Sequence, residues 1–304
     1  MPKLTELRGQ VAYAARVAAP ATERVEPSSL VWATDFDVLP SDHVIERRGG
    51  YLVVRSPSNP GHYWGNMLLF DDPPTAEDAA RWERLFEAEF AAEPRVRHRT
   101  FGWDRVDGAL GCAREEFVSR GYDLEETIGL VAAADHLRPH RRENREVRGR
   151  ALDPAAGADG DLWDAVIELQ VAGREEGHDE ARYRTFRRAR QGDLRGLFRA
   201  GRGGWYVALS PDGGEVLASC GIVVTCARGR FQAVDTAAAH RRRGICSRLL
   251  VEAARHSAER CGTARFVIVA DAHYHALGLY ESLGFQPREH VHGVCLWPRL
   301  GNSS

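Results

Sequence analysis

A glycine among arginines, at the start of an amphipathic segment, most constrains the fold of this chain. Residues 241–247 follow a strand-like stretch, 231–236, and precede a segment whose apolar residues recur at helical spacing. The first N–H groups of a helix have no partner within the helix, and glycine lets the backbone approach a ligand closely. We therefore predict a phosphate-binding loop at 241–247. An arginine-rich turn in solvent is the simpler interpretation of this run taken alone.

The segments that follow favour the first interpretation. Residues 265–270 are a nearly continuous apolar run, which is typical of a strand buried on both faces. A helix that contains Tyr280 and ends at Gly284 comes next, and a strand at 291–297 follows it. The predicted order is therefore strand, loop, helix, buried strand, helix, strand.

In this order, residues 204–297 resemble the GNAT acetyltransferase superfamily. Arg241 and Gly244 match the family's pyrophosphate loop, Gln/Arg-x-x-Gly-x-Gly/Ala, with Cys246 at its last position. Tyr280, followed by Gly284-Phe285, matches a second motif, whose usual upstream Asn is replaced by His273. The resemblance implies an α+β fold with a mixed, mainly antiparallel sheet flanked by helices. It also implies acetyl-CoA, or another acyl-CoA, as co-substrate.

The resemblance also assigns roles in amide formation. A backbone N–H near Val234 would stabilise the oxyanion, and Tyr280 would protonate the leaving thiolate, since a phenol with an ordinary pKa near 10 keeps its proton at neutral pH. For the base we prefer Asp235, then His273, then Glu176. Tyr280 as a core residue, Asp235 as a surface carboxylate and proton removal through water are the alternatives. The predicted donor-binding residues are Val234, Asp235, Thr236, Arg241, Arg242, Arg243, Gly244, Ile245, Cys246, Ser247 and His273.

An acidic, glycine-containing loop lies between two predicted helices at 163–170 and 183–194. In the family this region closes over the acceptor, so Glu175, Glu176 and His178 are the predicted substrate-binding residues and imply a cationic amine. The alternative is that the acidic residues of this loop only stabilise a helix N-terminus.

The N-terminal half repeats the same layout. Residues 117–122 and the strand-like stretch 125–132 correspond to 280–285 and 291–297, and strands are predicted at 51–55 and 62–70. Ala79, Trp82, Phe86 and Phe90 mark one face of a helix. A coincidental similarity is the alternative to a duplication.

The N-terminal copy lacks the features that would bind a donor. Residues 71–74, Asp-Asp-Pro-Pro, stand in place of the glycine loop, and Phe117 replaces the phenol. Proline removes a backbone donor and aspartate adds negative charge where a pyrophosphate would lie. We predict a degenerate GNAT-like domain at 1–136 that lines the acceptor site, a polar linker at 137–144, and an acetyltransferase domain at 145–304.

Composition narrows the partners. The 304 residues carry a formal net charge of −2, so a general nucleic-acid binder is not expected. Neither a signal-type apolar core nor a membrane-spanning run is present, and the six cysteines form no Cys-x-x-Cys pair. We expect a cytoplasmic protein that has reduced thiols and no metal.

The function expected from these observations is direct transfer of an acyl group, acetyl first, from acetyl-CoA to an amine of a small molecule. An acyl-enzyme at Cys246 is a minor alternative, because no Cys/His nucleophile signature is present. An acyl carrier protein as donor and a non-catalytic acyl-CoA-binding module are the two other hypotheses. The acceptor itself is not specified by donor-site motifs.

Overall fold

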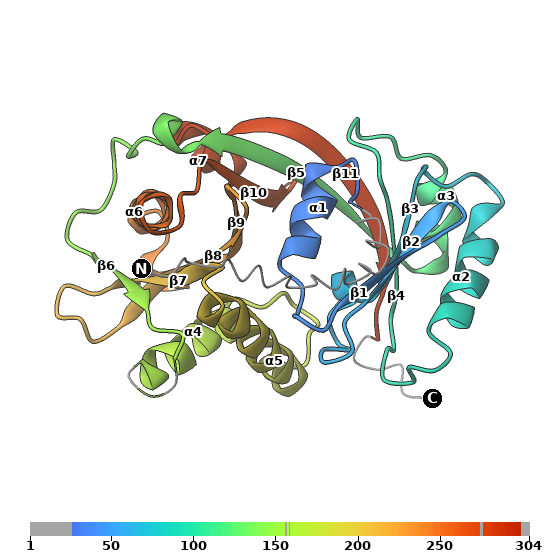
Figure 1. Cartoon of the computed structure of the whole chain (residues 1–304), viewed down its shortest axis with the longest axis horizontal. Helices are drawn as coiled ribbons and strands as arrows, with labels where there is room; N and C mark the ends of the chain where they lie inside the picture. The colour runs from blue at the N-terminus through green and yellow to red at the C-terminus, as the bar shows by residue number, and fades with distance from the viewer. Residues whose placement is uncertain (1–25, 156, 158, 274–275, 299–304) are drawn as a thin grey trace, which may run out of the picture.

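The computed structural model describes residues 26–298 apart from 156, 158, 274 and 275. Its strands form one mixed sheet in the order β1-β2-β3-β4-β11-β5-β10-β9-β8-β7-β6 (Figure 1). The strands are β1 (Val44–Arg48), β2 (Tyr51–Arg55), β3 (Met67–Phe70), β4 (Arg99–Trp103), β5 (Asp123–Ala133), β6 (Arg148–Leu152), β7 (Gly203–Leu209), β8 (Val216–Thr225), β9 (Arg228–Thr236), β10 (Arg265–Asp271) and β11 (Gln286–Leu296). The α-helices are α1 (Leu30–Asp37), α2 (Asp78–Glu89), α3 (Ala113–Glu116), α4 (Gly160–Ala172), α5 (Glu180–Arg199), α6 (Ile245–Cys261) and α7 (Leu277–Ser282). Short 3-10 helices are η1 (Tyr63–Gly65), η2 (Val118–Arg120), η3 (Ala134–His136) and η4 (Ala238–His240).

The two halves of the chain repeat one arrangement, as predicted. In the N-terminal half, from α1 to β5, the order β3-α2-β4-α3-β5 matches β9-α6-β10-α7-β11 of the C-terminal half, from β6 to β11. In each half the strands on either side of the long helix are parallel: β3 with β4, and β9 with β10. The other neighbouring pairs among the described strands are antiparallel. The mixed, mainly antiparallel sheet is confirmed.

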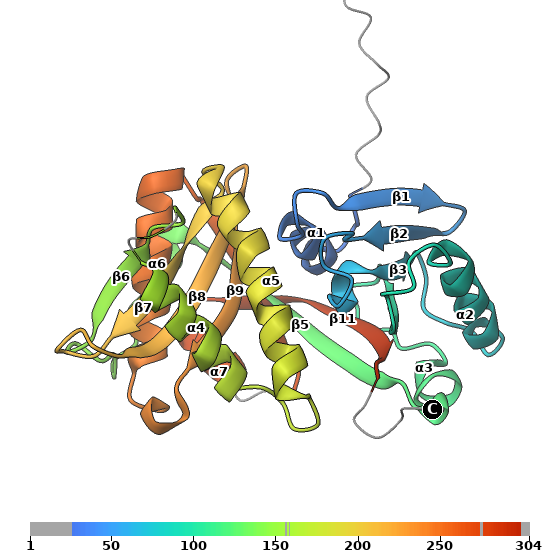
Figure 2. The same cartoon turned by 90° about the horizontal axis from the view of Figure 1, so that it is seen from below.

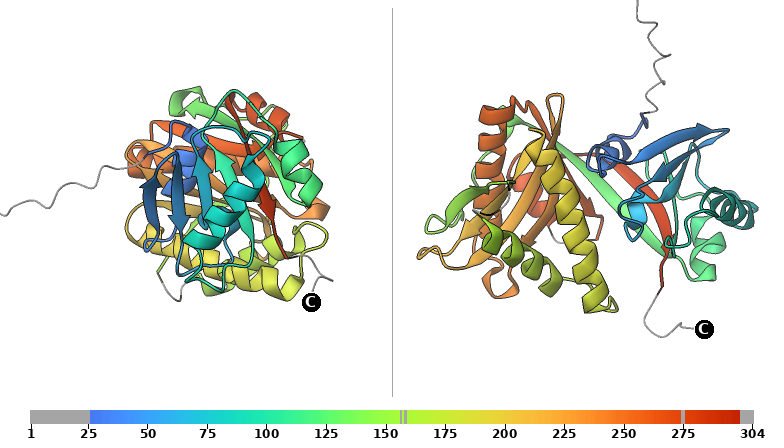
Figure 3. Two further views of the ribbon diagram at one scale, coloured as in Figure 1. Left: turned by 90° about the vertical axis from the view of Figure 1, so that its right-hand side faces the viewer. Right: turned by 60° about the horizontal axis from the view of Figure 1, so that its bottom comes forward.

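The last strand of each half lies in the other half. β5 pairs with β10 along the whole of β10, from Arg265 opposite Ala133 to Asp271 opposite Thr127. β11 pairs with β4 and also with β5. Figure 3 shows β5 in green and β11 in red crossing between the halves. The exchange joins the two halves through backbone hydrogen bonds.

Helices cover the sheet of the C-terminal half on both faces (Figure 2). α6 and α7 pack on one face around residues such as Leu249, Phe266 and Tyr280. α4 and α5 pack on the other face against Trp205 and its neighbours. α1 lies at the junction of the halves, where its buried residues meet both β2 and β11. We call the side of the sheet covered by α6 the donor face and the side covered by α5 the acceptor face, after the binding sites predicted from the sequence.

The predicted helix faces are confirmed, whereas one predicted strand is too long. Ala79, Trp82, Phe86 and Phe90 are buried against β3 and β4. The strand expected at 62–70 is only β3, because η1 occupies 63–65. The Asn66 amide donates to the carbonyls of Asn59 and His62, at 3.0 Å each, and holds that turn closed.

The predicted linker packs against the C-terminal half. The Arg138 N–H donates to the carbonyl of Leu283 at 3.0 Å, and the Asn144 N–H donates to the carbonyl of Gly244 at 3.1 Å. The boundaries 1–136, 137–144 and 145–304 remain a prediction along the sequence. In space, the strand exchange means that neither range closes a sheet alone. No helix within the described residues is long and apolar enough to cross a membrane.

Candidate active site

The predicted phosphate loop lies between β9 and α6, as expected. Gly244 has φ +74° and directly precedes α6, and no side chain caps the first turn of that helix. Arg242 also has a positive φ, of +59°, which is unfavourable for a residue with a side chain and is concentrated at functional loops in general. The three arginines are exposed, and the Nε of Arg241 donates to the carbonyl of Thr236 at 3.2 Å. The loop offers uncapped N–H groups beside exposed positive charge.

Glycine is required at position 244 for a reason that the sequence does not reveal. A Cβ atom there would meet the carbonyl oxygen of Arg142 at 1.9 Å and the nitrogen of Asn144 at 2.8 Å. Gly284, in the second motif, similarly faces the carbonyl oxygen of His136 at 2.5 Å. Both motif glycines therefore accommodate the backbone between the two halves. A bulky residue at Gly244 would displace this linker before it obstructed a pyrophosphate.

β9 and β10 separate beyond a short parallel ladder. Their pairing ends at Arg230 opposite Val267, and the register of β9 with β8 shifts between Ser219 and Gly221. Ala233, with φ +42°, lies in this bulge. Val234 packs toward the donor-face core, while the Asp235 carboxylate lies on the acceptor face, 3.9 Å from where a Cβ of Gly173 would be. The gap and bulge thus leave the backbone of β9 beyond Arg230 unpaired with β10.

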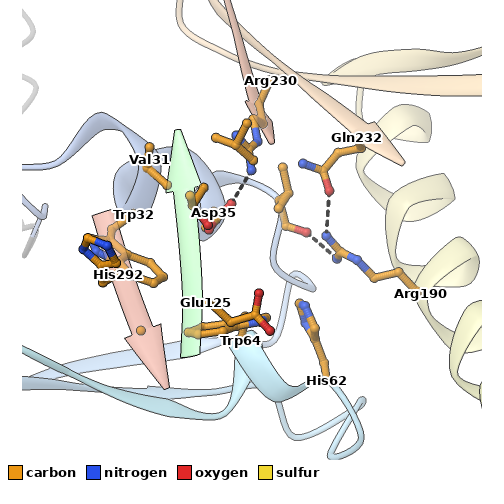
Figure 4. Close-up of a pocket in the computed structure, with 14 residues that line it drawn as sticks. Val31, Trp32, Asp35, His62, Trp64, Glu125, Arg190, Arg230, Gln232 and His292 are labelled. Atoms are coloured by element: carbon orange, nitrogen blue, oxygen red, sulfur yellow. Dashed lines mark hydrogen bonds and ion pairs between the residues drawn. The ribbon is translucent and has the colours of Figure 1, made fainter. Parts of the chain in front are cut away.

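A cavity of about 240 Å³ opens at this gap on the acceptor face (Figure 4). Its walls come from both halves: α1, η1 and β5 on one side, and α5, β9 and β10 on the other. Trp32 and Trp64 form an aromatic wall, with ring centroids 5.7 Å apart. The N-terminal half therefore contributes to the lining of this cavity, and its role at an acceptor site stays a prediction.

Two arginines and one aspartate lie at one end of the cavity. Arg230 is 4% exposed and donates through Nη2 to Asp35 Oδ1 at 2.5 Å. Arg190 donates to the carbonyl of Val38 at 2.5 Å and to Gln232 Oε1 at 3.3 Å. Burial lowers the pKa of Arg190 to about 10, which leaves the guanidinium charged at neutral pH. The charge of Asp193 also acts on Arg190 and that of Asp37 on Arg230, but neither of these carboxylates lines the cavity.

Glu125, on β5, lies toward the other end (Figure 4). Burial, together with the charges of Glu175, Asp271 and Asp123, raises the pKa of Glu125 to about 7. His62 also lines the cavity, and burial lowers the pKa of its imidazole well below the usual value. A carboxyl group that titrates near neutral pH in a cavity is a candidate general base.

Asp235 has a related environment outside the cavity lining. Burial raises the pKa of Asp235, and the charges of Arg187 and Arg241 partly offset this effect. The Oδ2 atom of Asp235 is buried with no hydrogen-bond partner among the described residues. Both Asp235 and Glu125 are therefore carboxyl groups poised to hold a proton on the acceptor face.

The remaining donor-site residues divide between core and surface. Tyr280 is 5% exposed and packs in the donor-face core with Phe285, at a ring-centroid distance of 6.3 Å. Burial raises the pKa of the Cys246 thiol to about 12, which opposes thiolate formation and an acyl-enzyme at this residue. Ile245 and Ser247 are buried in the first turn of α6, where the Ser247 hydroxyl donates to the carbonyl of Gly244 at 2.9 Å.

The acidic loop lies close to the cavity. Glu175 and Glu176 are exposed, and the charge of Glu175 contributes to the raised pKa of Glu125. The His178 ring stacks on Trp297, with centroids 4.4 Å apart. Asp179 caps α5 by accepting from the Arg182 N–H at 2.9 Å, so the capping alternative is confirmed for this residue.

His273 belongs to a different cluster, around Glu126, of which His292 also lines the cavity. Its Nε2 lies 3.5 Å from Glu126 Oε2, and Nε2 atoms of His290 and His292 lie 3.9 and 3.8 Å from the same oxygen. Glu126, His290 and His292 each offer a ligand atom within 4.8 Å of the others, so they are the described residues that fit a metal ion. Arg114 already pairs with Glu126 Oε1 at 2.8 Å, which satisfies half of that carboxylate.

Four of the residues that line the cavity were not predicted from the sequence: Asp35, Glu125, Arg190 and Arg230. They lie on four different elements, and each looks like an ordinary polar residue of a helix or strand. The one available signal is Arg230, a charged residue directly before the predicted strand at 231–236 that leads to the predicted phosphate loop. A charge in such a strand requires a partner, and here that partner is in the other half.

Known proteins share both the sequence pattern of the C-terminal region and the fold of this chain. Residues 201–287 match the model of the acetyltransferase (GNAT) domain. The C-terminal region therefore contains a GNAT acetyltransferase domain, and the fold of the chain resembles that of a tandem GNAT protein. A comparison with curated proteins gives no match.

Three solved structures share most of the fold at low sequence identity. A conserved protein of unknown function from Staphylococcus epidermidis aligns with a TM-score of 0.65 and 14% identity, over 84% of this chain and 94% of that one. A GCN5-related N-acetyltransferase from Kribbella flavida aligns with a TM-score of 0.58 and 14% identity, over 88% and 94%. A tandem GNAT protein from the clavulanic acid biosynthesis pathway aligns with a TM-score of 0.50 and 13% identity, over 87% and 86%.

Proposed function

We propose that this chain is an acyl-CoA-dependent N-acyltransferase that passes an acyl group, acetyl first, directly from the CoA thioester to an amine of a small molecule. The observation that carries the proposal is the cavity at the gap between β9 and β10, because β9 also leads into the loop around Gly244. Donor and acceptor would thus meet across one strand.

The proposed reaction uses groups on both faces. Glu125 takes the proton from the acceptor ammonium, and the neutral amine attacks the thioester carbonyl carbon. A backbone N–H near Val234 stabilises the oxyanion. The carbon–sulfur bond then breaks, and Tyr280 gives its proton to the departing thiolate. The nitrogen loses its second proton to solvent as the amide forms, and solvent returns the proton held by Glu125 to Tyr280, so the products are an amide, free CoA and one released proton.

Thiol release is the test of this proposal. Purified protein is incubated with acetyl-CoA and separate pools of amino acids, polyamines, aminoglycosides and peptides. Acceptor-dependent release, with the acetylated product found by mass spectrometry, would support the proposal. Thiol release that occurs only with an acylated carrier protein would show that the carrier protein, and not CoA, is the acyl donor. Tight CoA binding with no release from either donor would favour a non-catalytic module.

A further inference from the structure

We infer that the acceptor carries a carboxylate as well as an amine, and that it is an amino acid or a molecule built like one. This inference rests on the proposed function and names its substrate class. It starts from Arg230, whose guanidinium is buried at the end of the cavity. One nitrogen, Nη2, binds Asp35, while Nε and Nη1 have no hydrogen-bond partner among the described residues.

An incompletely bonded guanidinium in a cavity indicates a missing anion. A guanidinium has five N–H donors arranged to bind a carboxylate through two parallel hydrogen bonds. Buried donors without partners are costly, so side chains of this kind are normally satisfied. A substrate carboxylate would supply the acceptors that Arg230 lacks.

A purely structural role for Arg230 explains less. Asp35 and Arg230 connect α1 to β9, but Arg228 and Asp37 already make that connection with a bond of 2.6 Å from Nη2 to Oδ2. Arg228 and Asp37 do not line the cavity, whereas Asp35 and Arg230 do. The second ion pair therefore places charge in the cavity in addition to holding α1 on the sheet.

A second buried cation, Arg190, lines the same end of the cavity. Its hydrogen bonds go to the neutral oxygens of Val38 and Gln232, and the carboxylates whose charges act on it are Asp193 and Asp35. Asp35 is the carboxylate that faces both arginines. Asp193 and Asp37 do not line the cavity, so a bound carboxylate would meet two guanidinium groups there with only Asp35 between them.

The remaining walls fit the rest of an amino acid. Glu125 lies toward the opposite end and suits an ammonium group, which it would also deprotonate. Trp32 and Trp64 offer an apolar surface for a side chain. The cavity of about 240 Å³ suits a small molecule of this size. The acidic loop that contains Glu175 and Glu176 predicted a cationic amine. It thus accounts only for the amine group of the acceptor.

The test compares acceptors that differ only in the carboxylate. For each amino acid, thiol release from acetyl-CoA is measured with the free acid, with its primary carboxamide and with the corresponding decarboxylated amine. We expect at least a tenfold higher kcat/KM for the preferred free acid than for its carboxamide, because a charge-assisted pair of hydrogen bonds is lost. Equal or better use of the carboxamide or the amine would overturn the inference.

A matched pair of double variants assigns the effect to Arg230. Asp35→Asn with Arg230→Gln removes the cavity pair without leaving a lone buried charge, and Asp37→Asn with Arg228→Gln removes the neighbouring pair. We expect the first variant to lose the preference for the acid, to within about threefold, and the second to retain it. Retained preference in a folded Asp35→Asn/Arg230→Gln protein would overturn the assignment.

Failure of the inference can be told apart from failure of the proposed function. Release with amines or carboxamides, but without preference for acids, would leave the acyltransferase proposal intact. Absence of release with every acceptor would remove the proposed function and the inference with it. If the first double variant does not fold, the comparison of acids with carboxamides on the native protein still decides.

Discussion

Glu125 shows how little a residue's local sequence says about its chemistry. It lies in the run Asp-Leu-Glu-Glu at 123–126, which is typical of a solvent-exposed strand end. In the folded protein it faces a cavity, and burial with neighbouring negative charges raises its pKa to about 7. Its side chain thereby becomes able to exchange a proton at neutral pH.

The raised pKa predicts a cost in stability at neutral pH. A native pKa of about 7, against an ordinary value of 4.5, means that the native state holds the proton more tightly, so the free energy of unfolding falls as pH rises between these values. We expect Glu125→Gln to be more stable than the native protein at pH 8, by on the order of 1 to 3 kcal/mol, and equally stable near pH 4. Urea unfolding at both pH values measures this difference. Glu126→Gln is the control, because it breaks an ion pair with Arg114 and brings no such gain.

The same group predicts a pH dependence of catalysis. If Glu125 removes the amine proton, kcat/KM should rise with pH through a midpoint of about 7 as the carboxyl group ionises. We expect Glu125→Gln to lose that step and to reduce turnover about a hundredfold or more. A step that survives in Glu125→Gln but disappears in Asp235→Asn would identify Asp235 as the base.

The hydroxyl group of Tyr280 can be tested by itself. Tyr280→Phe keeps the ring that packs in the donor-face core, so the free energy of unfolding should change by about 1 kcal/mol. Turnover should fall about a hundredfold to ten-thousandfold, with little change in CoA affinity. Tyr206→Phe is the matched control, since Tyr206 is buried in the same core and its hydroxyl contacts His256. Near-native kcat in Tyr280→Phe would make it a core residue only.

At the scale of elements, α6 is bounded by two glycines that have different requirements. Gly244 and Gly262 both have positive φ, but a Cβ at Gly262 has open space around it, whereas one at Gly244 meets the linker carbonyl of Arg142. We expect Gly262→Ala to cost about 1 kcal/mol for the backbone conformation, and Gly244→Ala to cost at least about 2 kcal/mol more. Thermal unfolding of the two variants measures the difference. Equal losses would mean that the linker does not pack on α6.

The elements that sequence analysis predicted are those specified by local patterns. Helix α2 could be predicted because its apolar residues Ala79, Trp82 and Phe86 recur at helical spacing within one segment. The start of α6 could be predicted because Gly244 directly precedes a segment with the same spacing. The partner of Arg230 could not be predicted, because Asp35 is brought to it by tertiary packing alone. The bulge at Ala233 and the exchange of β5 with β11 likewise depend on pairings between distant strands.

For the whole molecule, strand exchange predicts that the halves depend on each other. Residues 145–304 alone would leave β10 without β5, and β11 without both of its neighbours. Unpaired strand edges promote aggregation. We expect this fragment to aggregate when produced alone and to form a soluble complex when produced together with residues 1–144. Size-exclusion chromatography and CoA titration test this. A lone fragment that is monomeric and binds CoA would contradict it.

The position of β11 also has a consequence for how the protein is made. A ribosome releases β4 long before it synthesises residues 286–296, so the edge of β4 that β11 will cover is open throughout the synthesis of the second half. At about 5–20 residues per second, that exposure lasts on the order of ten seconds or more. During this time a chaperone, or the β4 edge of a neighbouring nascent chain, can compete for the position that β11 finally takes.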